Sequence, residues 1–258
     1  MNDWACEVIY QDEYLVAINK PSGLLVHRSP IDRHETRFAL QLVRDQIGQH
    51  VYPVHRLDKP TSGVLLFGLS GEMARLVSGQ FAAATVHKHY LAVVRGYCPQ
   101  GGLIDHPLQL KLDRIADRDR RQDPLPQQAQ TRFQRLATVE VPFAVDRYPQ
   151  SRYSLVALQP RTGRKHQLRR HMKHIGHPII GDAKHGKGLH NRFFQAQYDC
   201  HRLLLACVGM ELSHPVTGQP LQLQAALDAP FWRVLEAFGW QAAVAADLHP
   251  PAFAPPAL

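Results

Sequence analysis

The chain has 258 residues, a net charge of +8 at pH 7 and an ordinary apolar share of 45%. Its length allows one sizeable domain or two small ones, and no apolar run approaches the roughly 20 residues that a membrane span needs. The N-terminal residues have neither the basic start nor the apolar segment of a signal peptide, so we expect a cytoplasmic protein. The four cysteines form no Cys-x-x-Cys pair, which disfavours a zinc site and a disulfide framework.

The first half of the chain alternates short strand patterns with helical ones. Apolar periodicity predicts strands at 6–10, 14–19, 64–67 and 86–96, and helices at 37–47 and 72–84. The alternation in 86–96 places Lys88 and Tyr90 on one face of their strand. Between 113 and 131, acids and arginines alternate and are followed by proline and glutamine, without apolar periodicity. We expect a solvated, mobile insertion there.

The second half begins and ends with strand patterns around one strongly basic helix. The predicted elements are strands at 131–141, 152–159, 202–212 and 221–225, and helices at 162–175 and 231–240. In the first of these helices, a buried stripe of apolar residues would leave Arg169, Arg170 and Lys173 outside it. From residue 242 onward alanine and proline predominate without periodicity, so we expect one domain, 1–241, and a disordered tail, 242–258.

The stretch 55–67 joins a polar, turn-rich loop to an apolar strand pattern. Asp58 has three positive or potentially positive neighbours in this loop: His55, Arg56 and Lys59. Nearby cations keep a carboxylate ionised, and the proline and glycine that follow suit a rigid turn. An ionised, positioned aspartate can act as nucleophile or base. The alternative from the residues alone is that Asp58 caps a turn and its neighbours are solvated.

Residues 161–192 carry the whole excess of positive charge, with nine Lys or Arg residues against the single acid Asp182. Such a cluster is the electrostatic footprint of a polyanionic partner, whereas a merely solvated surface usually intersperses acids. Several histidines lie in the same segment, but their neighbours are basic rather than carboxylates, so we expect no metal site.

Four motifs resemble the RluA family of pseudouridine synthases, and the resemblance extends over about residues 7–240. They are His55-Arg56-Leu57-Asp58 with Thr61-Ser62-Gly63, Lys88-His89-Tyr90, Thr162-Gly163-Arg164 with His166-Gln167-Leu168-Arg169, and Gly176 to Asp182. The resemblance implies an α+β fold with a large mixed, mostly antiparallel β-sheet and flanking helices. It implies isomerisation of uridine to pseudouridine in RNA, with no cofactor and no metal. The family-like pattern begins so early that we expect no N-terminal S4 module.

The resemblance also assigns roles to residues. Asp58 would be the nucleophile, Tyr90 would lie over the target base as a candidate for proton transfer, and Arg169 would pair with Asp58 and keep it ionised. The target uridine must be flipped out of its stack, and Arg56 would fill the vacated place. Two further expected RNA contacts are His55 and Lys88. Four more are expected to bind phosphates, which carry no sequence information: Arg164, Lys165, Arg170 and Lys173.

The substrate expected from the resemblance is tRNA, at uridine 65 in the T stem. The stretches 183–186 and 191–194 are more similar to a tRNA-modifying member of the family than to the ribosomal RNA enzymes. One alternative is a 23S ribosomal RNA pseudouridine synthase. Another is an RNA N-glycosylase, disfavoured because glycoside hydrolysis usually employs two carboxylates and no second acid accompanies Asp58. A third is a non-catalytic RNA-binding module. We expect a monomer without a protein partner.

Overall fold

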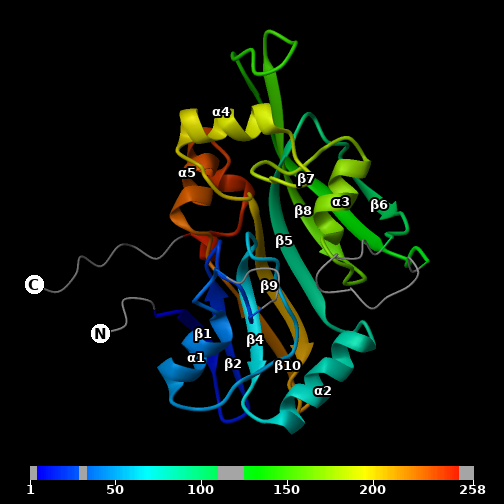
Figure 1. Cartoon of the computed structure of the whole chain (residues 1–258). Coiled ribbons are helices and arrows are strands. Elements are labelled where there is room, and N and C mark those ends of the chain that lie inside the picture. The colour runs from blue at the N-terminus through cyan, green and yellow to red at the C-terminus, as the bar shows by residue number, and fades with distance from the viewer. Residues whose placement is uncertain (1–4, 29–33, 110–124, 250–258) are drawn as a thin grey trace, which may run out of the picture.

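The computed structural model describes residues 5–28, 34–109 and 125–249, which form one large sheet with helices against it (Figure 1). The strands are β1 Glu7–Gln11, β2 Leu15–Lys20, β3 Tyr52–Pro53, β4 Ser62–Gly68, β5 His87–Arg95, β6 Gly101–Asp105, β7 Gln130–Val141, β8 Ser151–Pro160, β9 Leu205–Ser213 and β10 Pro220–Gln224. The helices are α1 Ala39–Ile47, α2 Gly71–Ala82, α3 Gln167–His174, α4 Gly188–Tyr198 and α5 Ala229–Ala237, followed by 3₁₀ turns at Gln241–Ala243 and Ala246–Leu248.

The sheet runs in the order β1-β2-β4-β9-β5-β8-β7-β6, with β10 beside β9 and β3 beside β4. Among the described strands, β4 and β9 pair in parallel and every other pair is antiparallel. The predicted α+β architecture, a large mixed and mostly antiparallel sheet with flanking helices, is confirmed. The parallel pair matters for the site because β4 begins four residues after Asp58.

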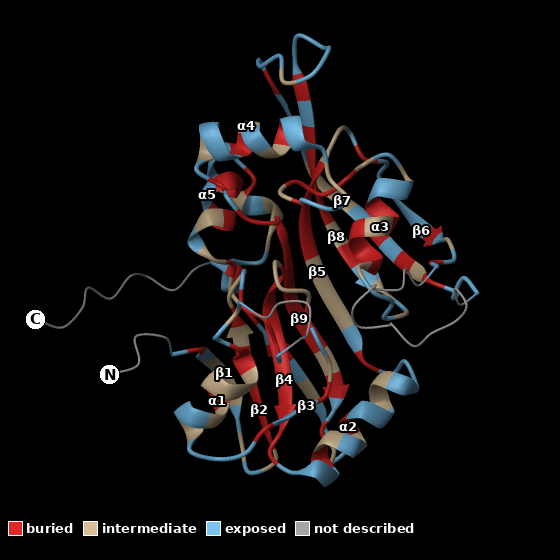
Figure 2. Ribbon diagram, in the orientation of Figure 1, coloured by how far each residue is buried: buried red, intermediate tan, exposed pale blue. Residues whose placement is uncertain are grey.

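The core lies on both faces of the sheet, and the central strands are buried along most of their length (Figure 2). On β5, Leu91 and Val93 join the apolar cluster of α4 and α5, whereas Ala92 and Val94 join the cluster of α3. This alternation follows from the two-residue period of a strand. The sheet therefore fixes the position of α3, the most basic helix, relative to β4 and β5. None of the described helices has the length and hydropathy that a bilayer crossing requires.

Most predicted elements are found within a few residues of their expected bounds, but α3 is shorter than predicted. It begins at Gln167, because His166 has a left-handed backbone conformation, with a φ of 55°. Residues 162–166 form a turn instead of the first helical turn. Helix α4 was not predicted from the sequence: its buried residues, His190 and Phe194, are spaced as in a helix, but one of them is a histidine and the apolar pattern is weak.

Each of the two regions expected to lack order contains residues that the structure describes as packed. Of the predicted tail, residues 250–258 lie outside the described residues, but Leu248 is buried and accepts a hydrogen bond from the backbone of Leu227. Of the predicted insertion at 113–131, residues 113–124 lie outside the described residues. Gln127 pairs with Leu108, and Thr131 is a buried residue of β7. Long-range contacts, which the sequence does not display, hold the described residues of both segments.

Gly63 is the residue that allows β4 to approach β9, and replacing it should destabilise the fold. Its φ is +106°, and a Cβ would lie 2.0 Å from the carbonyl oxygen of Cys207. We expect Gly63→Ala to lower the free energy of unfolding by at least about 2 kcal/mol, measured by urea denaturation. Gly79→Ala is the matched control, because Gly79 lies within α2 with open space around it. The control should gain about 0.5–1 kcal/mol; equal stabilities of the two variants would contradict the close approach.

Candidate active site

Asp58 lies in a tight turn that leads into β4. The backbone N–H of Thr61 donates to the carbonyl of Asp58 at 3.0 Å and closes the turn. The turn at 20–23, at the end of β2, holds this loop from outside: Gly23 N donates to the carbonyl of Lys59 at 2.9 Å, and Ser22 Oγ donates to that of Pro60 at 2.8 Å. The predicted rigid presentation of Asp58 thus depends on a second turn that is distant in sequence.

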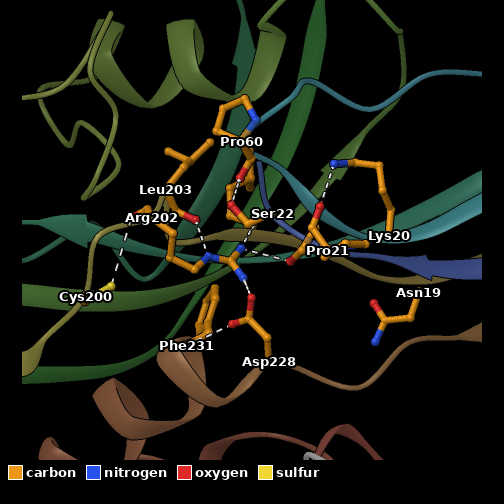
Figure 3. A network of polar contacts seen from close by, with 12 residues as sticks. Asn19, Lys20, Pro21, Ser22, Pro60, Cys200, Arg202, Leu203, Asp228 and Phe231 are labelled. Carbon is orange, nitrogen blue, oxygen red and sulfur yellow. Dashed lines mark hydrogen bonds and ion pairs between the residues drawn. The ribbon is translucent and has the colours of Figure 1, made fainter. Parts of the chain in front are cut away.

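Lys20 lies beneath this loop and is fully buried. Its ammonium donates to three backbone carbonyls, those of Pro21 at 2.8 Å, Leu24 at 2.7 Å and Lys59 at 3.2 Å. Figure 3 shows the first of these bonds. Burial and, to a smaller extent, the charge of Arg202 lower the pKa of Lys20 to about 7, against the opposing effect of Asp58. Lys20 therefore fastens the Asp58 loop to the end of β2. Sequence reasoning missed it, because an isolated lysine usually indicates a solvated surface.

Arg202 is the second buried cation behind the loop. Its guanidinium forms an ion pair with Asp228, the N-cap of α5 (Figure 3). The same group donates to the hydroxyl of Ser62 at 2.9 Å. It also lies 5.6 Å from the centroid of the Phe231 ring. These contacts join the first residue of β4 to the C-terminal helix.

Arg169, on α3, joins two carboxylates. Its Nη1 donates to Asp58 Oδ2 at 3.0 Å, while Nε and Nη2 donate to the two oxygens of Asp182 at 2.7 and 2.8 Å. The predicted pairing of Arg169 with Asp58 is present. The prediction that Arg169 lies outside the buried stripe is wrong, because the residue is only 5% exposed. Its ion pair with the buried Asp182 makes that burial tolerable.

The ionisation of this cluster follows from its pairing. Burial alone lowers the pKa of Arg169, but its bonds to Asp182 and Asp58 raise the pKa above the ordinary value. Burial alone raises the pKa of Asp182, but Arg169 and the backbone N–H groups of His185 and Lys184 hold it below the ordinary value. Both groups are therefore charged at neutral pH. The one signal that could have pointed to Asp182 is that it is the only acid between residues 161 and 192.

His166 is the other side chain that faces Asp58. Its Nε2 lies 3.9 Å from Asp58 Oδ2, and its Nδ1 lies 3.0 Å from Nε2 of His185. Burial lowers the pKa of His166 to about 4, although the charge of Asp58 acts in the opposite direction. His166 is therefore neutral at pH 7. Sequence reasoning considered these histidines only as metal ligands and did not place His166 beside Asp58.

Tyr90 lies on β5, half-buried, where a bulge shifts the pairing register of β5 with β9 and brings Tyr90 opposite Cys207. Its pKa is raised well above the ordinary value by burial, by the Cys207 thiol and by the charge of Asp58. Tyr90 is thus a protonated phenol at neutral pH, close enough to Asp58 to feel its charge. Lys88, on the same strand, lies with its Nζ 5.7 Å from the centroid of the Phe81 ring, and burial lowers its pKa.

The remaining predicted RNA contacts lie at the surface around α3 and the Asp58 loop. Arg56 is exposed, two residues from Asp58. Arg164, Lys165 and Lys173 are exposed and Arg170 is half-buried. Arg164 also donates from Nε to the carbonyl of Gln128 at 3.0 Å, which connects the turn before α3 to the chain leading into β7.

His55 occupies a different environment from the one expected. Its Nε2 accepts a hydrogen bond from the backbone N–H of Leu66 at 3.0 Å, and its ring stacks on Phe81 with centroids 5.0 Å apart. Burial, and then the charge of Lys88, lower the pKa of His55 to about 3. This geometry supports a packing role and does not favour the predicted contact with RNA.

These buried histidines predict acid sensitivity. The pKa is lowered to about 3 for His55 and to about 4 for His166 and His190, whereas an unfolded histidine titrates near 6.5. Between pH 6.5 and 5 the unfolded chain therefore binds more protons than the folded one, so stability falls with falling pH. We expect a loss of about 1.4 kcal/mol per pH unit for each such histidine well below pH 6.5.

Urea denaturation at pH 7, 6 and 5 measures this slope, and His55→Gln should make it shallower by up to one histidine's share. A free energy of unfolding that does not change from pH 7 to 5 would show that these imidazoles are protonated as readily in the folded state as in the unfolded one.

Comparison with known proteins agrees with this geometry. A family model described as RNA pseudouridylate synthase matches residues 14–174. The tRNA pseudouridine synthase C of Yersinia pestis is 55% identical over 234 residues, which cover 91% of each chain. The protein of the same name from Pectobacterium carotovorum subsp. carotovorum is 57% identical over 235 residues, covering 91% of this chain but only 62% of that one.

Two human structures share the fold. Human RNA Pseudouridylate Synthase Domain Containing 4 is 27% identical, with a TM-score of 0.66 and coverage of 90% of this chain and 93% of that one. Human RNA Pseudouridylate Synthase Domain Containing 1 has the same TM-score at 22% identity, covering 92% and 90% of the two chains. The resemblance of its motifs to the RluA family is thus confirmed: the chain belongs to the RNA pseudouridylate synthase family of isomerases.

Proposed function

We propose that the protein isomerises uridine to pseudouridine in tRNA, at uridine 65 of the T stem, with Asp58 as the nucleophile. The main support for Asp58 as the nucleophile is its contact with the buried Arg169, whose Nη1 donates to one carboxylate oxygen of Asp58 at 3.0 Å. The tRNA substrate is supported by relatives named tRNA pseudouridine synthase C at 50% identity or more. The exact position follows from the family resemblance.

In the proposed reaction the target uridine first leaves the RNA helix, because a stacked nucleotide cannot reach Asp58. Arg56, exposed beside Asp58, fills the vacated place. Arg169 holds Oδ2, so Oδ1 of Asp58 attacks C1′ of the ribose while the glycosidic C–N bond breaks and the electron pair leaves with uracil.

The detached uracil then turns and bonds to C1′ through C5, which displaces Asp58 as a carboxylate. C5 then loses its proton and N1 takes up a proton, which gives the neutral pseudouridine ring. Tyr90, a neutral phenol at the edge of the site, packs against the base and serves as a candidate for proton transfer. Residues 5–249 would act as one catalytic domain and as a monomer in the cytoplasm, without metal or cofactor.

An N-glycosylase is the alternative that the geometry tests most directly. A second carboxylate does accompany Asp58 through Arg169, so the expectation that no other acid lies nearby is wrong. However, Asp182 is buried and accepts hydrogen bonds from Arg169, Lys184 and His185. A carboxylate held in this way is unavailable as the general acid that glycoside hydrolysis usually employs.

The basic surface around α3 should make tRNA binding depend on salt. Four predicted phosphate contacts lie on it: Arg164, Lys165, Arg170 and Lys173. Changing all four to glutamine should weaken binding and reduce the slope of log K against log salt by up to about three units, because each lost phosphate contact removes about 0.7–0.9. A filter-binding titration from low to high salt measures the slope. Arg75→Gln, an exposed change on α2, is the control, and an unchanged slope in the quadruple variant would contradict the proposed RNA surface.

The function itself is tested by incubating the protein with unmodified tRNA and, separately, with a 23S ribosomal RNA transcript, and mapping pseudouridine by carbodiimide-dependent reverse-transcription stops. We expect one new stop at position 65 of tRNA. A stop only in ribosomal RNA would replace the substrate. Free uracil without a stop would indicate a glycosylase, and binding without product would leave an RNA-binding module.

A further inference from the structure

We propose that Asp182 is a positioning residue of the reaction, acting through Arg169, and that helix α4 holds it in place. This inference rests on the proposed function and adds to it a residue that does not touch the substrate. Arg169 distributes its hydrogen-bond donors unequally between two carboxylates.

The guanidinium of Arg169 uses one whole edge for Asp182. Nε donates to Oδ2 at 2.7 Å and Nη2 to Oδ1 at 2.8 Å, a two-point contact that fixes the plane of the group. Only Nη1 then faces Asp58, with a single bond of 3.0 Å to Oδ2. Asp58 is thereby oriented while its other oxygen makes no bond to Arg169. The oxygen that makes no bond to Arg169 is available for nucleophilic attack.

Without Asp182, the guanidinium fork would be free to turn and grip both oxygens of Asp58, the geometry that an arginine and a carboxylate prefer. Such a contact would occupy the attacking oxygen. It would also draw Asp58 toward α3 and away from the ribose, and a displacement of about 1 Å can cost about 100-fold in rate. Asp182 prevents this by competing for the guanidinium.

Asp182 is itself held rigidly by its neighbours. The backbone N–H groups of Lys184 and His185 each donate to its Oδ1 at 2.9 Å. Asn191, on α4, binds the backbone at Gly181 and Asp182 with both ends of its amide. Its Oδ1 accepts a hydrogen bond from Gly181 N at 2.8 Å, and its Nδ2 donates to the carbonyl of Asp182 at 3.0 Å.

Packing fixes the loop at Gly181 and helix α4, the two elements that hold Asp182. A Cβ on Gly181 would lie 1.9 Å from the carbonyl oxygen of Arg202, so the loop lies directly on the backbone before β9. Helix α4 is fixed to the sheet by the contact of His190 Nδ1 with the hydroxyl of Tyr153 at 2.8 Å. A continuous series of contacts therefore runs from Tyr153 on β8 through α4 to Asp182, Arg169 and Asp58.

The test compares kcat and KM for pseudouridine formation. Asp182→Asn should lower kcat about 100-fold with a KM for tRNA within about threefold of the original, because Asp182 is buried and does not contact RNA. Asp199→Asn, which removes an exposed carboxylate at the end of α4, is the matched control and should change neither constant. If Asp182→Asn fails to fold, Asn191→Ala replaces it, with an expected fall in kcat of about 10-fold.

A double-mutant cycle with Arg169→Lys distinguishes positioning from a general structural effect. If Asp182 acts through Arg169, Asp182→Asn should have almost no further effect on kcat once Arg169 is lysine. Additive losses, or an unchanged kcat in the folded Asp182 variant, would overturn the inference. The wild-type protein is assayed in parallel: if it forms no pseudouridine, the proposed function fails instead.

Discussion

Replacing Asp58 with asparagine is expected to lower kcat for pseudouridine formation by at least about 10⁴-fold, a loss typical of removing a catalytic nucleophile. The amide is nearly the same size as the carboxylate but cannot attack C1′. Because Asp58 is half-buried and contributes no phosphate contact, tRNA affinity should change by less than about threefold. Single-turnover assays and filter binding measure the two quantities.

Asp45→Asn is the matched control for this prediction. Asp45 is exposed on α1, where it pairs with Arg44, and its replacement should leave both activity and affinity unchanged. Turnover by Asp58→Asn at a tenth of the wild-type rate or faster would show that Asp58 is not the nucleophile.

The second large effect is expected for Arg169→Met, which removes the cation between two carboxylates. Asp182 would be left buried, 1% exposed at its side chain, without its ion pair. Breaking a buried pair by removing one partner typically costs about 3–5 kcal/mol, which urea denaturation would show. We also expect activity to fall about 10³-fold, because Asp58 loses the hydrogen bond that orients it.

Arg75→Met provides the comparison, because Arg75 is an exposed arginine on α2. Its stability should change by no more than about 0.5 kcal/mol, and its kcat should be unaffected. If Arg169→Met were as stable and as active as Arg75→Met, the ion-pair cluster would have no part in either folding or catalysis.

Apolar patterns predicted most strands, because β-strands with one or two buried faces carry a clear apolar pattern, whereas the sheet class was predicted from the resemblance to the RluA family. The sequence did not predict the strand order or the parallel pairing of β4 with β9, since pairing between distant strands leaves no local signal. Helix α4 was missed because its buried positions include His190, and β6 was missed because it begins with two glycines.

For the site, the motifs that resemble the family selected Asp58, Tyr90 and Arg169 as candidate catalytic residues. The structure places these three residues around the Asp58 loop. The residues that support them were not predictable in the same way. Lys20 and Asp182 are charged residues that are buried by contacts made far along the chain. A charged residue in a sequence is normally taken to be exposed, so only the fold reveals that these two organise the site.

The central claim is that Asp58 and Arg169 serve one isomerisation at uridine 65 of tRNA. Its most direct test uses a tRNA transcript carrying tritium at C5 of its uridines, since bonding of C5 to the ribose releases the C5 hydrogen. The wild-type protein should release one equivalent of tritium per tRNA, and none should be released by Asp58→Asn or from a transcript with cytidine at position 65. Undiminished release from that transcript would contradict the position, and undiminished release by Asp58→Asn would contradict the mechanism.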